Sequence, residues 1–332
     1  MKKDIGLCGL GNSLVDVQIY ATDEDILKLN LNKGEMRLVD MKEQKKLIKH
    51  FNKKIDNKSS GGSAANTIIA FSKFGGKAAY MSVLGNDDMG NFYINEFKEL
   101  GIQLAYYQIE DIPSGTCLVI ITPDSERTMC TYLGATGTFN ESHLNEDLIS
   151  RAKWLYIEGY QFSSEASTRA VFKAIEMAKT HKTKIAITFS DVFIINQFKD
   201  NLEKALRESD LIFCNEAEAL AYTKKYETLP AIKGIQQITK NSVITLGAGG
   251  SVINWAGQLL QIPAYPAKPI DSTGAGDIFA GALIYGLLYS ESGEIAGNLA
   301  SYSAAKIVSQ LGARLQENHK EIRNYIFSKF AK

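Results

Sequence analysis

Hydrophobic positions along the chain follow two periods, one typical of buried strands and one typical of amphipathic helices. Short apolar runs predict strands at 4–10, 78–83, 154–157, 184–187, 211–213 and 242–246. Helical spacing predicts helices at 41–51, 63–74, 89–100, 165–179, 196–207 and 216–224, and, after a hairpin at 251–262, at 275–289, 294–310 and 320–330. Repeated strand-then-helix units predict an α/β protein with a mostly parallel sheet covered by helices on both faces.

The pattern changes between residues 103 and 132, where short β-like runs at 116–121 and 128–132 are joined by turn residues. An alternating run at 14–19 and a short strand at 36–39 have similar character. We expect these parts to form a small second sheet over one end of the main one. Because the chain holds no repeat, low-complexity tract or linker, we expect a single domain over 1–332, with a lid formed by about 12–39 and 103–132.

Composition narrows the classes of function. The 332 residues include 37 Lys and Arg against 37 Asp and Glu, so the formal net charge is zero, which argues against nucleic-acid and membrane-surface partners. The longest apolar run, 278–289, is shorter than the roughly 20 residues of a membrane helix. The widely spaced cysteines are expected to be buried free thiols, and with no signal-peptide pattern we expect a cytoplasmic protein: Cys8, Cys117, Cys130 and Cys214.

Four glycine clusters mark candidate ligand sites, because ligands of parallel α/β sheets bind where strands end and helices begin. They lie at 9–12, 60–63, 247–250 and 274–277. None completes the dinucleotide fingerprint G-x-G-x-x-G: Leu14, Val252 and Phe279 stand where its last glycine is needed. Gly76-Lys77 also lacks the context of a P-loop. A nicotinamide-dependent enzyme and a P-loop enzyme are therefore disfavoured.

The cluster Asp271-Ser-Thr-Gly-Ala-Gly-Asp277 opens an apolar helix with three small residues. Free backbone N–H groups at such a helix start bind an anion, with no side chain in the way. Asp277 places a carboxylate beside this site, where it can take the proton of an attacking hydroxyl. Plain helix capping by Asp277 is the alternative interpretation.

Three other polar features have two interpretations each. Asn215 and Glu218 form either a helix capping box or a site that places Mg²⁺ through water. Asp16 is either a solvated strand residue or a ligand of hydroxyl groups, and Arg127 is either a surface charge or a clamp on a transferred phosphate. The four histidines lack metal-site spacing.

Taken together, the clusters resemble the ribokinase-like, or PfkB, family of carbohydrate and nucleoside kinases over essentially the whole chain. Residues 271–277 resemble the family's D-T-x-G-A-G-D, with Ser272 for threonine, and residues 61–66 resemble its G-G-x-x-x-N. Residues 215–218 match N-x-x-E, and 245–250 match T-x-G-x-x-G. The resemblance implies a three-layer α/β/α sandwich with a small β lid, and an ATP-dependent kinase with an alcohol acceptor.

The resemblance also implies roles for individual residues. The catalytic group comprises the base Asp277, the anion hole Gly274, Ala275 and Gly276, and Arg127 at the transferred phosphate. The acceptor group comprises Asn12, Asp16, Gly61, Gly62, Ser63, Asn66, Tyr160 and Phe162. The ATP and Mg²⁺ group comprises Asn215, Glu218, Thr245, Gly247, Gly250, Asn298 and 301–305, with Glu218 holding Mg²⁺ through water. Asp271 and Thr273 are the family's candidate K⁺ contacts.

Within the family, three segments resemble the adenosine kinase branch: residues 11–16, 156–160 and 213–218. This branch phosphorylates the 5′-hydroxyl of adenosine, and Tyr160 or Phe162 would stack on the purine unless both are core residues. A free sugar such as ribose or fructose is the alternative acceptor. A catalytically idle nucleotide-binding regulator is disfavoured because Asp277 and the glycines before it are intact. The sequence leaves the oligomeric state open between a monomer and a homodimer.

Overall fold

The computed structural model describes residues 2–34, 36–51, 55–124, 126–290 and 292–330. A nine-stranded sheet runs through the larger part of the protein in the order β14-β13-β12-β11-β10-β9-β1-β5-β6. Seven strands are parallel: β1 (Ile5–Leu10), β5 (Ala78–Gly85), β6 (Gln103–Ile109), β9 (Ala152–Glu158), β10 (Lys184–Thr188), β11 (Leu211–Asn215) and β12 (Ser242–Thr245). The hairpin of β13 (Ser251–Trp255) and β14 (Gln258–Ile262) adds the antiparallel edge. The predicted mostly parallel sheet is confirmed.

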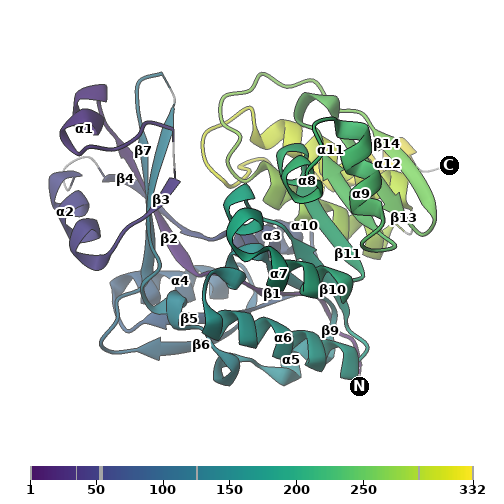
Figure 1. The fold of residues 1–332 in the computed structure, drawn as a ribbon, viewed down its shortest axis with the longest axis horizontal. Helices are drawn as coiled ribbons and strands as arrows, with labels where there is room; N and C mark the ends of the chain where they lie inside the picture. Colours follow the sequence, from purple (N-terminus) through teal and green to yellow (C-terminus); the bar gives the residue numbers. More distant parts are fainter. Residues whose placement is uncertain (1, 35, 52–54, 125, 291, 331–332) are drawn as a thin grey trace.

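Helices cover both faces of this sheet, because successive side chains of a strand point to opposite sides. One apolar core holds Leu7 of β1 and helices α3 (Ser63–Lys73), α4 (Asp88–Glu99), α10 (Ala275–Tyr289), α11 (Gly293–Ile307) and α12 (His319–Phe330). The other holds Cys8 of β1 and helices α5 (Glu146–Arg151), α6 (Glu165–Thr180), α7 (Val192–Arg207), α8 (Glu216–Thr223) and α9 (Thr228–Gln236). The result is the expected three-layer α/β/α sandwich (Figure 1).

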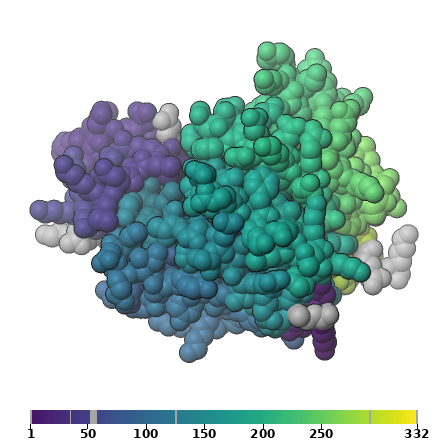
Figure 2. Space-filling view, turned by 60° about the horizontal axis from the view of Figure 1, so that its bottom comes forward, coloured from purple at the N-terminus to yellow at the C-terminus, as the bar shows by residue number. Residues whose placement is uncertain are grey.

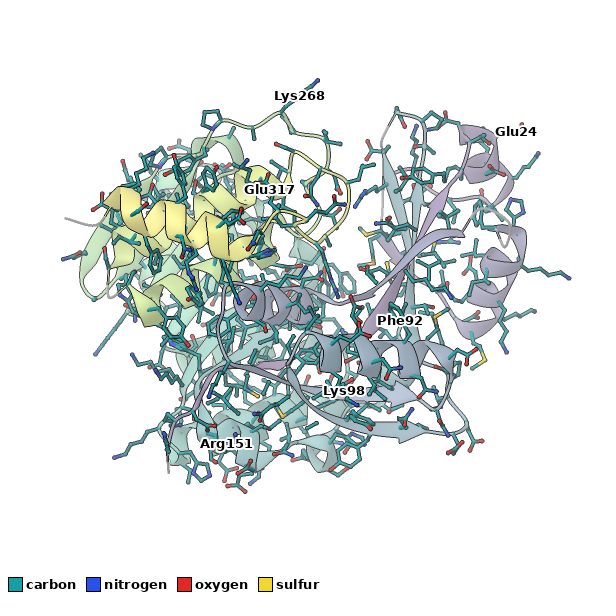
Figure 3. The ribbon with its side chains drawn as sticks, turned by 180° about the vertical axis from the view of Figure 1, so that it is seen from behind. Glu24, Phe92, Lys98, Arg151, Lys268 and Glu317 are labelled. Atoms are coloured by element: carbon teal, nitrogen blue, oxygen red, sulfur yellow. The ribbon has the colours of Figure 1, made fainter. Side chains whose placement is uncertain are left out.

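A second, five-stranded sheet stands beside the main body in the order β3-β8-β7-β2-β4 (Figure 1). Its strands are β2 (Leu14–Tyr20), β3 (Met36–Leu38), β4 (Ile55–Gly61), β7 (Gly115–Ile121) and β8 (Arg127–Tyr132). Helices α1 (Asp23–Lys28) and α2 (Met41–Phe51) lie on its outer side, and in the space-filling view they form a purple lobe beside the body (Figure 2). Seen from behind, α1 with Glu24 stands opposite the body loop that carries Lys268 (Figure 3).

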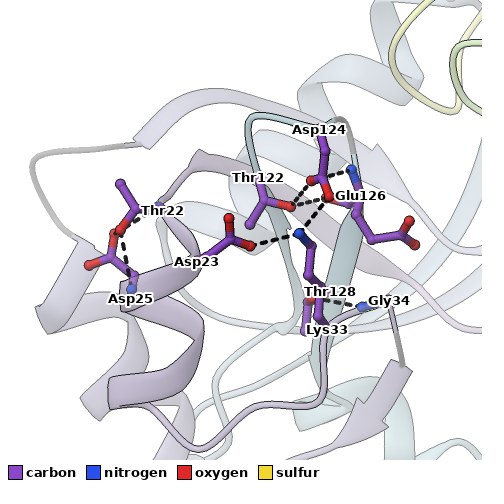
Figure 4. Close-up of polar contacts among 9 residues, drawn as sticks. All are labelled: Thr22, Asp23, Asp25, Lys33, Gly34, Thr122, Asp124, Glu126 and Thr128. Carbon is purple, nitrogen blue, oxygen red and sulfur yellow. Dashed lines mark hydrogen bonds and ion pairs between the residues drawn. The ribbon is translucent and has the colours of Figure 1, made fainter.

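An ion-pair cluster fastens the far end of the small sheet. Lys33 Nζ lies 2.7 Å from Asp23 Oδ1 and 2.6 Å from Asp124 Oδ2 (Figure 4). The Gly34 N–H donates to Thr128 Oγ1 at 3.1 Å in the same region. These contacts join the start of α1, the chain leading to β3 and the β7–β8 hairpin, so the small sheet is braced as one unit.

Two boundaries of the expected lid change. Residues 103–109 form β6, which pairs in parallel with β5 in the main sheet, because α4 returns the chain to that sheet as a βαβ unit. The small sheet instead gains β4, which pairs with β2. Its sequence, Ile-Asp-Asn-Lys-Ser-Ser-Gly, lacks the apolar alternation that would predict a strand. Helices α1, α5 and α9 were also not predicted.

Two further predictions from the composition concern the cysteines and membrane-spanning segments. Cys8, Cys117, Cys130 and Cys214 are all free and buried, as predicted. Within the described ranges, no helix combines the length and the apolar character needed to span a bilayer.

Candidate active site

The start of helix α10 forms an open, glycine-built cradle. Gly274 has φ +76°, and a Cβ there would lie 2.6 Å from the Ala313 carbonyl oxygen, so the position requires glycine. A Cβ on Gly276, in contrast, would meet no atom of the described residues within 4 Å. The Ala275 N–H donates to the Ser272 carbonyl oxygen at 3.2 Å. The next N–H groups, of Gly276 and Asp277, lie in the first turn of α10, where a helix supplies no carbonyl acceptor, and together with the helix dipole they favour an anion in this space.

Asp277 lies in the first turn of α10 and is held by two residues of α3. Ser63 Oγ donates to Asp277 Oδ1 at 2.6 Å, and Asn66 Nδ2 donates to Asp277 Oδ2 at 3.1 Å. Burial raises the pKa of Asp277 to about 6, while the bonds from Ser63 and Asn66 lower it. The carboxylate is therefore mostly ionised at pH 7 and sits beside the cradle, not inside a packed core.

Asp16 approaches the same centre from the small sheet. It lies on β2 against the end of β4, where a Cβ on Gly61 would be 2.3 Å from Asp16 Oδ1. Burial raises the pKa of Asp16 to about 7; the charges of Arg314 and Arg127 lower it, and that of Asp277 raises it. Asp16 is half-buried and lies near charged groups of both the small sheet and the main body, which favours its prediction as a ligand of hydroxyl groups.

Gly62 brings the β1–β2 loop to the start of α3. Its φ is +103°, and a Cβ there would lie 2.1 Å from the Asn12 carbonyl oxygen. The same oxygen accepts from Tyr80 OH at 3.0 Å, and Asn12 Oδ1 accepts from Gln161 Nε2 at 3.1 Å. The structure thus gathers six of the predicted acceptor residues around Asp277: Asn12, Asp16, Gly61, Gly62, Ser63 and Asn66.

The two predicted aromatic residues have different positions. Phe162 is 1% exposed and meets the ring of Phe172 edge-on within the core, so its prediction as a stacking surface is wrong. Tyr160 is half-buried, and its hydroxyl donates to the Ser190 carbonyl oxygen at 3.5 Å. Gln161, between them in the turn η4 (Gly159–Ser163), reaches Asn12; no local pattern pointed to it.

Arg127 and Asp271 form a buried ion pair beside the cradle. Arg127 Nη2 lies 2.6 Å from Asp271 Oδ2, and Arg127 Nη1 donates to Thr273 Oγ1 at 2.9 Å. Asp271 Oδ1 accepts from the Thr273 N–H at 2.9 Å, and Oδ2 accepts from the Gly312 N–H at 2.7 Å. Arg127 is therefore not a surface charge, and its buried Nε has no hydrogen-bond partner in the described part of the chain.

A cavity of about 650 Å³ adjoins the other side of the cradle, a size typical of small-molecule sites. Its lining includes the predicted nucleotide residues Thr245, Gly247, Gly250, Ser301, Ala304 and Ala305, together with Gly276. Asn298 does not line this cavity. It lines a neighbouring hollow of about 480 Å³, and its Oδ1 accepts from the hydroxyl of Tyr265, which lines both spaces. Its place near the nucleotide stays a prediction.

Asn215 and Glu218 form a reciprocal capping box at the start of α8. The Asn215 N–H donates to Glu218 Oε2 at 2.9 Å, and the Glu218 N–H donates to Asn215 Oδ1 at 2.8 Å. Burial raises the pKa of Glu218 to about 7. Asn215 pairs with Thr245 across β11 and β12, so the box adjoins the cavity. The capping box is therefore present and fixes the carboxylate near the nucleotide residues, while the magnesium role of Glu218 stays a prediction.

Comparisons with known proteins show the family of this chain. The sequence profile described as pfkB family carbohydrate kinase matches residues 34–320. Adenosine kinase of Saccharomyces cerevisiae is 30% identical over 329 residues, covering 91% of this chain and 94% of that protein. Ribokinase of Mus musculus is 30% identical over 240 residues, covering 69% and 71%.

Solved structures give the same answer for the fold. A probable sugar kinase from Rhizobium etli CFN 42 matches with a TM-score of 0.90 at 26% identity, covering 98% of this chain and 99% of that one. Adenosine kinase from Sinorhizobium meliloti matches with a TM-score of 0.88 at 24% identity, covering 97% and 99%. The predicted fold and the predicted kinase class are confirmed, and the chain belongs to the pfkB family of carbohydrate kinases.

Proposed function

We propose that this kinase transfers the γ-phosphoryl group of ATP to the 5′-hydroxyl of adenosine, giving AMP and ADP. The observation that carries the proposal is the position of the Asp277 carboxylate, which Ser63 and Asn66 hold at the mouth of the glycine cradle. The Saccharomyces cerevisiae relative, which this chain matches along nearly its whole length, supports adenosine as the acceptor.

The chemistry follows from three groups around the cradle. The oxygen of the acceptor hydroxyl bonds to the γ-phosphorus while Asp277 accepts the proton of that hydroxyl. The bond between the γ-phosphorus and the oxygen that bridges it to the β-phosphate breaks, which releases ADP. The N–H groups at Gly276 and Asp277 stabilise the charge of the group in transfer. Arg127, with its unpartnered Nε, adds positive charge next to the same space.

The donor side fits ATP. The cavity beside Gly276 has the volume and the glycine turns to take the nucleotide, with Gly247 and Gly250 in left-handed conformations that keep the backbone close. Glu218 would hold Mg²⁺ through water, and the ion would neutralise charge on the phosphates. We leave K⁺ out of the proposal, because both carboxylate oxygens of Asp271 already accept hydrogen bonds and its ion-pair partner is Arg127.

On the acceptor side, Asp16 can accept from two neighbouring ribose hydroxyls, since an ionised carboxylate has only acceptor sites. Gly61 and Gly62 connect the small sheet to α3, which makes them the hinge of a lid. Closure of this lid would exclude water, which otherwise competes with the hydroxyl for the phosphoryl group.

A free sugar is the second candidate acceptor, and one observation favours it. Phe162 is withdrawn into the core, while the amide of Gln161 faces Asn12, so this wall of the site is more polar than purine stacking requires. The Rhizobium etli neighbour, described as a probable sugar kinase, points the same way.

The deciding experiment measures ADP formation from ATP with adenosine, inosine, ribose and fructose at equal concentrations. Phosphorylated products are identified by mass, and the reaction without acceptor serves as the control. We expect adenosine to give the highest kcat/KM. Turnover on a sugar without turnover on adenosine would replace the first proposal with the second, and turnover on neither would refute both.

A further inference from the structure

Glu158 is a carboxylate at the end of β9 that the reaction described above does not use. Its side chain is 0% exposed. Oε1 accepts from the Asn12 N–H at 2.6 Å, and Oε2 accepts from the Ala64 N–H at 2.8 Å. The two donors lie 146 and 94 residues from Glu158 along the chain. One carboxylate therefore joins three separate segments.

The neighbouring backbone is shaped around this carboxylate. A Cβ on Gly11 would lie 2.5 Å from Glu158 Oε2, so only glycine lets the β1–β2 loop approach. Burial raises the pKa of Glu158 to about 7, and the bonds from the two backbone N–H groups lower it. Burying a charge is costly, and the cost is offset here because the carboxylate accepts from two backbone N–H groups that would otherwise be buried without a partner. The feature that a carboxylate adds is a pair of acceptors at fixed separation.

Both joined segments belong to the acceptor half of the site. Asn12 carries a side chain predicted to bind the acceptor, and Ala64 lies in the first turn of α3 between Ser63 and Asn66. Those two residues hold Asp277. Small displacements between acceptor and base are expensive in phosphoryl transfer, because the reacting atoms must be aligned within a fraction of an ångström. The nucleotide cavity has neither Asn12 nor Ala64 in its lining.

We infer that Glu158 is a positioning residue, which sets the acceptor loop at Asn12 and the base-holding turn of α3 at a fixed distance from each other. The inference rests on the proposed kinase reaction but not on the identity of its acceptor. The inference also explains why residue 11 is glycine, because a side chain at Gly11 would collide with Glu158.

The test compares Glu158→Gln with Glu165→Gln, which alters an exposed glutamate of α6 in an ion pair with Arg169. Glutamine keeps the size of Glu158 but places an amide N–H₂ opposite one of the two backbone N–H groups. With the best acceptor of the panel, we expect acceptor KM to rise and kcat to fall, each about tenfold, while the KM for ATP changes less than twofold. Glu165→Gln should match wild type. A merely structural role would lower the active fraction and hence kcat, but would leave acceptor KM unchanged, and that result would overturn the inference.

A second measurement needs no turnover and separates this inference from the proposed function. Amide hydrogen exchange of segments 9–14 and 62–68 reports on the two donated bonds. We expect protection to fall in both segments of Glu158→Gln and to stay unchanged in α6. If the wild type phosphorylates none of the four acceptors, the proposed function fails while this readout still decides the role of Glu158. Unchanged exchange in either segment would refute the inference. Should Glu158→Gln fail to fold, Glu158→Asp keeps the charge and, being one methylene shorter, should lose protection in one segment only.

Discussion

Asp277→Asn is the substitution that tests the catalytic centre most directly. Asparagine has nearly the same shape as aspartate, so the Ser63 hydroxyl can still donate to Oδ1. The new amide nitrogen would face Asn66 Nδ2, but the Asn66 Oδ1 is buried and unpartnered in the described chain. A half-turn of the Asn66 amide then provides an acceptor, so we expect the variant to fold with its site intact.

The expected loss follows from the role of the carboxylate. A positioned general base contributes about 10²- to 10⁴-fold in rate, or about 3 to 5 kcal/mol of the activation barrier. Since the pKa of Asp277 is raised to about 6, roughly nine-tenths of the wild-type carboxylates are ionised at pH 7, and nearly the full factor is available there. The variant should therefore retain at most about 1% of wild-type kcat, with KM values changed little.

The assay is the initial rate of ADP formation at saturating ATP and acceptor. The matched control is Asp147→Asn, which removes an exposed carboxylate of α5 that pairs with Arg151, and it should behave as wild type. A kcat for Asp277→Asn within threefold of wild type would refute the assignment of Asp277 as the base. Equal losses in both variants would show that the preparation, not the base, was responsible.

Five further results are expected. The kcat/KM of the wild type should fall as pH drops through about 6, because Asp277 must be ionised, and this limb should be absent from the residual activity of Asp277→Asn. Burial raises the folded-state pKa of Asp16 and of Glu218 to about 7, so between about pH 4 and pH 7 the folded protein binds more protons than the unfolded chain. Urea titrations should therefore show the free energy of unfolding decreasing from about pH 4 to pH 8. An increase over this range would contradict the burial argument. Gly276→Ala should keep or slightly raise Tm, because the added Cβ meets no described atom within 4 Å. The same variant should lose at least 100-fold in kcat/KM, because the methyl group occupies the anion site. Full activity would show that the phosphoryl group binds elsewhere. Arg314→Met should raise acceptor KM severalfold, since Arg314 bonds the Ser60 carbonyl at the hinge and the charge of Arg314 lowers the pKa of Asp16. In Glu218→Gln, the Mg²⁺ concentration that gives half-maximal activity should rise. An unchanged Mg²⁺ dependence would show that Glu218 does not lie near the ion.

The glycine turns show why much of the site was predictable. Part of the requirement at Gly274, Gly247 and Gly250 is local, because each has a positive φ, and the small residues that follow Gly274 open a helix. Such turns at the ends of predicted strands place ligand sites at one edge of a parallel sheet. Their order along the chain therefore indicates both the fold and the family.

The aromatic and polar neighbours of the acceptor were not predictable in this way. Phe162 and Gln161 are adjacent, and no periodicity tells which of them enters the core and which reaches Asn12. Glu158 and Arg314 likewise carry no local signal, because Glu158 bonds Asn12 across 146 residues and Arg314 bonds Ser60 across 254.

The boundaries of the lid also depend on contacts between distant segments. The strand β4 is polar and is ordered by pairing with β2, and the run at 103–109 joins the main sheet because α4 returns the chain beside β5. Hydrophobic spacing and glycine turns, which depend on near neighbours, were enough to predict the alternating α/β architecture and to single out the candidate anion cradle and the candidate base. The partners of each strand and of each buried charge were decided only by the tertiary structure, because a hydrogen bond or ion pair between distant segments depends on where the whole chain brings them together.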